Sequence, residues 1–168
     1  MPEKDTVFSS KMKYTGIVSF KDFYKFCYDW LKDETKLTFV KEEKYSEKIT
    51  AKGKDIDVTW KGERKVTDYF KFQIEVKFRV VGLTDVEVTQ QGIKIKTNQG
   101  IVEIKVKGIL IRDYEGKFET TAFMKFLRSI YEKWVIPSRV IQFEEKLISA
   151  SDEFLNQAKA YLDLEGKR

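Results

Sequence analysis

Alternation of hydrophobic and polar residues is the clearest pattern in the chain. From residue 70 to residue 80 every even position is apolar, and every odd position is polar or charged. Strict alternation over this length predicts a β-strand with one buried face and one face in water, which is typical of an antiparallel sheet covered on one side. Shorter segments repeat the pattern at residues 56–60, 86–88, 93–95 and 102–106.

Turn residues separate these segments and mark the ends of the predicted strands. They occur at Gly53, Gly62, residues 82–85, Gly92 and residues 98–100. Two weaker strands are expected, a short one through Tyr14, Ile17 and Val18 and another over residues 37–49. Gly108 interrupts the last strand, and the apolar positions beyond it shift by one residue, which predicts a bulge or a bend.

Two parts of the chain change to the three- and four-residue spacing of a helix. Ser19 is placed to cap a first helix, whose apolar stripe consists of Phe23, Phe26, Cys27, Trp30 and Leu31. Near the end of the chain, Thr120 or Thr121 is placed to cap a second helix, which Pro137 breaks or bends. A longer helix follows and reaches Leu162.

These elements predict a single α+β domain over residues 1–168. We expect a loose segment over residues 1–10, a strand, helix and antiparallel sheet over residues 12–113, and C-terminal helices over residues 118–164. The sheet should be curved, with about six to seven strands, and we expect the C-terminal helices to cover its apolar face. This order of elements resembles the START-like helix-grip superfamily, in which a curved sheet wraps a long C-terminal helix. The resemblance covers roughly residues 12–164 and implies an apolar ligand between sheet and helix.

Aromatic residues are abundant, at 14% of the chain, and we expect those of the helices to point into the same interior as those of the sheet. Phe123, Phe126 and Trp134 belong to this set. The expected lining of a ligand site consists of Phe72, Ile74, Phe78, Phe126, Ile130, Phe143 and Leu147. The same residues could instead fill the interior completely, because protein cores pack to near-crystal density.

Charge suggests a second kind of binding surface. Lys and Arg number 32 against 27 Asp and Glu, a net charge of +5, with the two signs finely mixed as on a solvated surface. The polar side of the predicted strands nevertheless carries more cations than acids. The acids on this side are Glu75, Glu87 and Glu103. The predicted basic patch consists of Lys71, Lys77, Arg79, Lys94, Lys96, Lys105 and Lys107. Such a patch either keeps strand edges soluble or binds an acidic protein, a nucleic acid or an anionic membrane.

The residue inventory argues against an enzyme. The chain has no His and one Cys, Cys27, on the apolar stripe of the first helix, which excludes Ser-His-Asp and Cys-His mechanisms and makes a zinc site improbable. Two carboxylate pairs, Asp55 with Asp57 and Asp113 with Glu115, lie near strand ends or turns, where acids are usually solvated. We therefore expect no catalytic residue, no metal and no cofactor, while an oxygen-only magnesium or calcium site through Asp55, Asp57, Asp113 or Glu115 stays open as an alternative.

The function that the sequence favours is a non-enzymatic binding domain for an apolar small molecule or lipid between sheet and C-terminal helix. The alternative is an interaction module that uses the basic sheet face. The chain opens on polar residues and its longest apolar runs are too short to span a bilayer, so we expect a protein of the reducing cytoplasm. The oligomeric state stays open.

Overall fold

The computed structural model describes residues 3–115, 121–135 and 137–166. The strands are β1 (Glu3–Ile17), β2 (Phe39–Thr50), β3 (Gly53–Lys65), β4 (Phe70–Gln90) and β5 (Ile93–Arg112). The helices are α1 (Phe20–Glu34), α2 (Ala122–Ile130), a short π-helix η1 (Tyr131–Val135) and α3 (Pro137–Gly166). All strands form one antiparallel sheet in the order β1-β5-β4-β3-β2. The α+β class is confirmed, but the sheet has five strands rather than six to seven.

Two long strands account for the smaller number. Residues 82–85 and 98–100, which were expected to be turns, lie inside the continuous ladder between β4 and β5. The register shifts between Val81 and Thr84, where Gly82 adopts a φ of 65°. The Gly82 N–H donates to Asp55 Oδ1 at 3.0 Å. Glycine tolerates this left-handed conformation, so a bulge absorbs the one extra residue of β4 and the ladder continues to the pair Gln90–Ile93.

The N-terminal strand is longer than expected. Residues 3–10, predicted to be loose, form the first half of β1 and pair with β5 as far as Glu3 opposite Arg112. Residues 1–2 lie outside the described residues. Six of the eight residues from 3 to 10 are polar or charged, and this strand lies at the edge of the sheet and buries little, so the sequence shows no clear alternation there.

Gly108 has a different role from the expected bulge. The register shift lies in the partner strand β1, between Thr6 and Phe8, while Gly108 stays in register with Ile74 of β4. A Cβ atom at Gly108 would lie 2.7 Å from Ser151 Oγ of α3. The glycine therefore allows α3 to approach the sheet closely.

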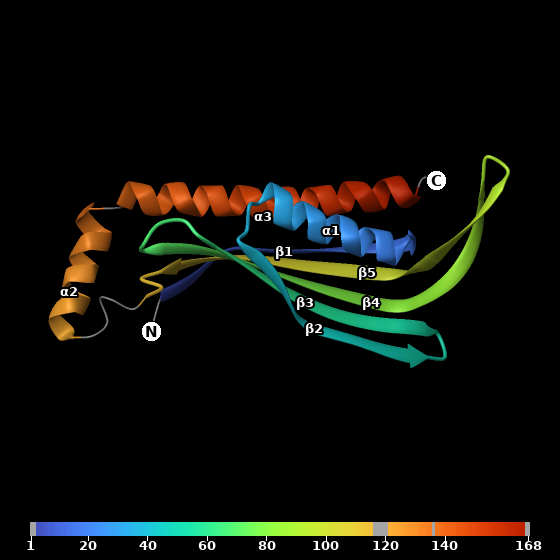
Figure 1. Ribbon diagram of the computed structural model, residues 1–168, viewed down its shortest axis with the longest axis horizontal. Coiled ribbons are helices and arrows are strands. Elements are labelled where there is room, and N and C mark those ends of the chain that lie inside the picture. Colours follow the sequence, from blue (N-terminus) through green and yellow to red (C-terminus); the bar gives the residue numbers. More distant parts are fainter. Residues whose placement is uncertain (1–2, 116–120, 136, 167–168) are drawn as a thin grey trace.

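Two helices, α1 and α3, lie over the same face of the sheet (Figure 1). On this face α3 contacts β1 and β5. The α1 helix packs over β3 and β4 through ring contacts of Phe23 with Phe78 and of Tyr24 with Trp60, with centroids 6.1 and 4.8 Å apart. The cover is thus shared with the first helix rather than made by the C-terminal helices alone. Neither helix lies on the opposite face of the sheet.

The α2 helix departs from the expected packing. Thr121 Oγ1 accepts from the Met124 N–H at 3.1 Å and caps it, while the alternative cap Thr120 lies outside the described residues. The helix has no buried residue, and the side chains of Phe123, Phe126 and Trp134 are 65%, 59% and 71% exposed. The expectation that these rings enter the core is wrong, because α2 lies beyond the end of the sheet instead of over it (Figure 1).

Candidate functional site

A row of lysines crosses the uncovered face of the sheet. Side chains alternate between the faces of a strand, so the odd positions of β4 and β5 point away from the helices. The pairing register places Lys11 opposite Lys105, Lys105 opposite Lys77, Lys77 opposite Thr59, and Thr59 opposite Lys44. We call Lys11, Lys105, Lys77 and Lys44 the central lysine row.

The rows on either side of it are organised differently. In one flanking row Lys13, Glu103, Arg79 and Asp57 follow one another across the sheet and alternate in sign. In the other flanking row Glu75 lies between Lys107 and Lys61. Opposite charges in such cross-strand pairs stabilise a sheet, and like charges destabilise it. The central lysine row contains no acid, so it places like charges next to each other where its neighbours avoid this.

The central lysine row lines a depression of about 530 Å³ in the open face. Its lining residues are Lys11, Lys44, Asp57, Val58, Thr59, Lys77, Phe78, Arg79, Glu103, Ile104 and Lys105. Lys77 Nζ lies 3.3 Å from Glu75 Oε1, but the other three lysines of the row form no ion pair within residues 3–115, 121–135 and 137–166. Three ammonium groups are thus available to an anionic ligand.

The structure gathers only part of the predicted basic patch on this face. Lys71, Lys77, Arg79, Lys105 and Lys107 lie there, although Lys71 Nζ is held by Glu63 Oε2 at 2.6 Å. Lys94 and Lys96 lie on the far hairpin of β4 and β5 and share the even phase of β5 with Val102, so they do not belong to the patch.

Sequence analysis missed Lys11 and Lys44, which lie on the two edge strands. Both strands bury few side chains, so their alternation is weak.

A second candidate site is a groove between α1 and the inner face of the sheet. Its volume is about 450 Å³, within the usual range of about 300–1,000 Å³ for small-molecule pockets. It is lined by Phe20, Lys21, Tyr24, Glu42, Tyr45, Glu47, Lys54, Ile56, Leu83 and Asn98. The lining therefore combines aromatic rings with two carboxylates and two ammonium groups.

The tyrosines of this groove are fixed hydrogen-bond donors. The Tyr24 hydroxyl donates to Glu42 Oε2 and accepts from Trp60 Nε1 at 3.0 Å. The Tyr45 hydroxyl donates to Glu47 Oε1 at 2.7 Å. Burial, and then the neighbouring carboxylate, raise the pKa of Tyr24 far above its usual value and the pKa of Tyr45 to about 12. Both phenols therefore stay protonated at neutral pH.

The predicted ligand lining under α3 is divided between two places. Phe72, Ile74, Phe78, Phe143 and Leu147 are buried in the core. Phe143 packs against Phe70 and Phe72, with ring centroids 5.1 and 6.2 Å apart. Phe126 and Ile130 lie on the exposed α2 helix instead. The seven residues therefore do not line one cavity.

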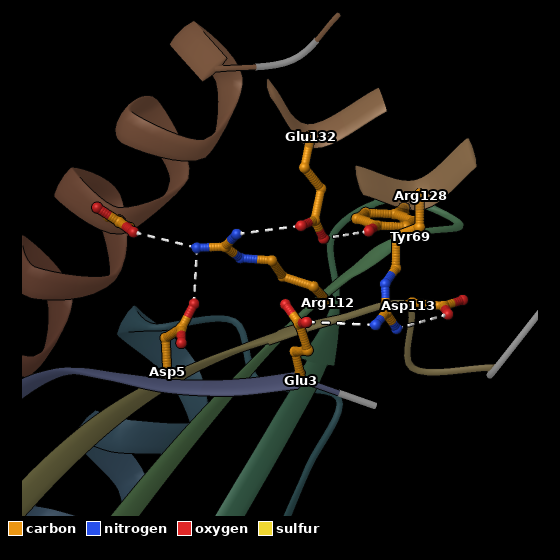
Figure 2. A network of polar contacts seen from close by, with 8 residues as sticks. Glu3, Asp5, Tyr69, Arg112, Asp113, Arg128 and Glu132 are labelled. Atoms are coloured by element: carbon orange, nitrogen blue, oxygen red, sulfur yellow. Dashed lines mark hydrogen bonds and ion pairs between the residues drawn. The ribbon is translucent and has the colours of Figure 1, made fainter. Parts of the chain in front are cut away.

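A network of polar contacts attaches α2 and η1 to the end of the sheet (Figure 2). Arg128 lies 3.5 Å from Asp113 Oδ2 and 3.3 Å from Glu3 Oε1. Glu132 accepts from the hydroxyl of Tyr69 and lies 3.6 Å from Arg112 Nη1. Burial, and then Glu132, raise the pKa of the Tyr69 hydroxyl well above its usual value, so it remains a donor.

The remaining candidate groups are occupied in structural roles. Cys27 is buried, and burial raises the pKa of its thiol, which keeps it protonated and poorly nucleophilic. Asp113 is buried beside Arg128, Asp55 holds the bulge at Gly82, and Asp57 belongs to an alternating charge row. Across the described residues, no helix combines the length and apolar character needed to cross a membrane.

The comparisons with known proteins add no relative: no protein-family model matches the chain, and no curated protein sequence matches it.

Proposed function

We propose that the protein is a non-enzymatic interaction module that binds an acidic macromolecule through the open face of its sheet. The observation that carries the proposal is the central lysine row. Its four lysines follow one another across the strands without an acid between them, whereas the flanking rows contain acids that offset their cations. Bringing like charges together lowers stability, and an arrangement of this kind is typical of a binding site.

The geometry of the row suits an extended anion. Neighbouring strands lie about 4.8 Å apart, so the row from Lys11 to Lys44 spans roughly 19 Å across the sheet. Several regularly spaced negative groups can contact it at once. No exposed aromatic ring lines the depression, since Phe78 points into the core and is 1% exposed. This composition favours electrostatic contact over base stacking.

Charge reversal tests the proposal. The triple variant Lys11→Glu, Lys77→Glu, Lys105→Glu should lose retention on immobilised duplex DNA, polyglutamate or phosphatidylserine vesicles, whichever of these probes retains the wild type at low salt. The wild-type affinity should fall steeply with salt, and the slope of log affinity against log salt should decrease by about three in the variant.

A matched control separates this face from net charge. Lys25, Lys32 and Lys159 are exposed on α1 and α3, and reversing all three gives the same change in net charge on the opposite side of the sheet. The control should retain binding. Equal loss in both variants, or no retention of the wild type by any of the three probes at low salt, would show that the central lysine row is not the binding site.

The groove beside α1 supports a second candidate function, the binding of a small amphipathic molecule. The resemblance to the START-like superfamily implies a ligand between the sheet and a helix, and this groove lies between the sheet and a helix, although the helix is α1 and not α3. Native mass spectrometry of protein from its native host should detect a bound molecule. Tyr24→Phe should weaken its retention because the variant removes one hydroxyl that faces the groove. An empty protein from the native host would argue against this candidate.

A further inference from the structure

The α2 helix is attached to the protein by its polar side. Arg128 and Glu132 face the end of the sheet, with side chains only 14% and 16% exposed, and they contact Asp113 and Arg112. The other side carries Phe123, Phe126 and Ile130, and Trp134 of η1 continues the stripe. We call these four residues the α2 patch; their exposures are 65%, 59%, 38% and 71%. A surface helix normally has the reverse orientation, with its apolar stripe on the core.

Ion pairs hold this orientation in place. Asp113 is 2% exposed, and Arg128 supplies the cation beside it (Figure 2). Turning the apolar side of α2 inward would remove Arg128 and leave a buried carboxylate without that cation, which is strongly unfavourable. It would also separate Glu132 from Arg112 and from the Tyr69 hydroxyl. The outward direction of the α2 patch is therefore a built feature of the fold.

The charges around the α2 patch indicate what covers it. Lys125 and Lys133 are exposed beside it, and Lys133 Nζ lies 5.2 Å from the ring centroid of Trp134. Within residues 121–134, as described, no carboxylate is exposed, because Glu132 is turned toward the sheet. Aromatic residues bordered by lysines suit the boundary between headgroups and acyl chains of an anionic bilayer. Trp and Lys are both favoured at that depth.

A second copy of the chain fits the α2 patch less well. Stable interfaces bury about 800 Å² on each partner, whereas a fully buried aromatic side chain contributes only about 150–250 Å². Three partly exposed rings and one isoleucine supply well under that area. A symmetric pair would also bring Lys125 and Lys133 of one copy toward those of the other, which is unfavourable because like charges repel each other.

We propose that the α2 patch inserts into the interfacial layer of a membrane containing anionic lipid, with Phe123, Phe126 and Trp134 as the anchors. The helix then lies in the plane of the membrane surface and does not cross it. The proposal does not depend on the proposed function, because it concerns another surface of the molecule.

Tryptophan fluorescence of the full chain gives a direct test. Trp60 is buried and Trp30 is packed against the core, so Trp134 is the most exposed of the three indoles. Adding vesicles of phosphatidylcholine with phosphatidylserine should shift the emission to shorter wavelength, and brominated lipid should quench it. Both effects should be lost in Trp134→Phe. Vesicles of phosphatidylcholine alone should bind more weakly, because Lys125 and Lys133 then have no anionic lipid to contact.

Co-sedimentation with the same vesicles identifies the anchors. Phe126→Ser should weaken binding about tenfold, and Phe123→Ser with Phe126→Ser should abolish it. The matched control is Ile49→Ser on β2, where an isoleucine is 81% exposed outside the α2 patch, and it should bind as the wild type. Circular dichroism should show that all variants keep their fold, because the replaced side chains are exposed.

Three outcomes would overturn the proposal. The first is a wild-type protein that does not sediment with the vesicles and whose Trp134 emission does not change when they are added. The second is vesicle binding that is lost in Lys105→Glu but unaffected by Phe126→Ser, which would assign membrane contact to the sheet face alone. The third is a dimer in solution that Phe126→Ser dissociates, which would make a second copy the occupant of the α2 patch.

Discussion

Replacing Lys105 by Glu should stabilise the protein in the absence of a ligand. Lys105 lies at the middle of the central lysine row, directly opposite Lys11 on one side and Lys77 on the other. The substitution converts two like-charge pairs into two opposite-charge pairs. Each cross-strand pair contributes roughly 0.2–1 kcal/mol, so both changes together should raise the free energy of unfolding by about 1 kcal/mol. For a chain of this size, that corresponds to a rise in Tm of about 2–4 °C.

The control for this variant lies two residues further along the same strand and on the same face. Lys107 is opposite Ser9 on β1 and Glu75 on β4, so Lys107→Glu replaces an attraction by a repulsion. It should lower the free energy of unfolding by about 0.5 kcal/mol. Both variants exchange the same residue types on one strand, so differences in intrinsic strand propensity cancel.

Thermal and urea unfolding at low salt should measure both effects, and the difference between the two variants should shrink at 1 M salt, where the Debye length is about 3 Å. Lys105→Glu should also weaken binding to the polyanion that retains the wild type. A variant that gains stability and loses binding is the expected result if neighbouring cations were selected for recognition at the expense of stability. If Lys105→Glu is not more stable than the wild type at low salt, or if Lys107→Glu gains as much, repulsion within the row is too weak to matter.

Three further predictions concern the core and the phenols of the groove beside α1. Gly108→Ala should lower the free energy of unfolding by about 1–3 kcal/mol, because the new Cβ would lie 2.7 Å from Ser151 Oγ. Ser151→Ala should recover part of that loss in a double-mutant cycle measured by urea unfolding, and strictly additive effects would rule out this clash. Phe72→Ala should cost about 3–5 kcal/mol in the same assay, and a loss under about 1 kcal/mol would place the ring outside the core. The pKa of Tyr24 is raised, and that of Tyr45 is raised from 10.0 to about 12, so folding favours the protonated phenols. Their contribution to the free energy of unfolding should be fully present below pH 10.0 and should decline above it, because the phenols of the unfolded chain then ionise first. Equal urea midpoints at pH 8 and pH 11 would contradict the raised pKa values.

Strict alternation carried the reliable part of the sequence prediction. The even residues from Phe70 to Val80 are buried as predicted, because a strand in the middle of a sheet covered on one side has two distinct environments. Edge strands lack this contrast. In β1 and β2 most side chains are partly or fully exposed on both faces, which explains why residues 3–10 were expected to be loose. The central lysine row could not be predicted for the same reason, since Lys11 and Lys44 are on those strands.

The division of β4 and β5 into shorter strands failed for a different physical reason. Glycine at residue 82 and the polar residues around it are compatible with a reversing turn and with a bulge, and only the pairing partner decides between them. Because Gly82 forms a bulge, β4 and β5 continue as one hairpin beyond it. Lys94 and Lys96 then occupy even positions of the same strand on which Lys105 occupies an odd position, so they point to the opposite face.

The spacing of Phe123, Phe126 and Ile130 identified a helix correctly but not its orientation. An apolar stripe predicts burial, yet Arg128 and Glu132 on the other side found partners at the end of the sheet. Those partners, Asp113 and Arg112, come together with α2 only in the folded chain.

The strand order has a consequence for how the chain reaches its folded state. β1 is synthesised first but pairs only with β5, and Glu3 finds its partner at Arg112, so the N-terminal strand has no place in the sheet until β5 has been made. Closing a loop of that length is entropically costly and slows folding. During this interval β5 is an open edge to which a strand from another molecule could add. Lys105, Lys107 and Glu103 on β5 then oppose aggregation, because a charged edge pairs poorly with foreign strands.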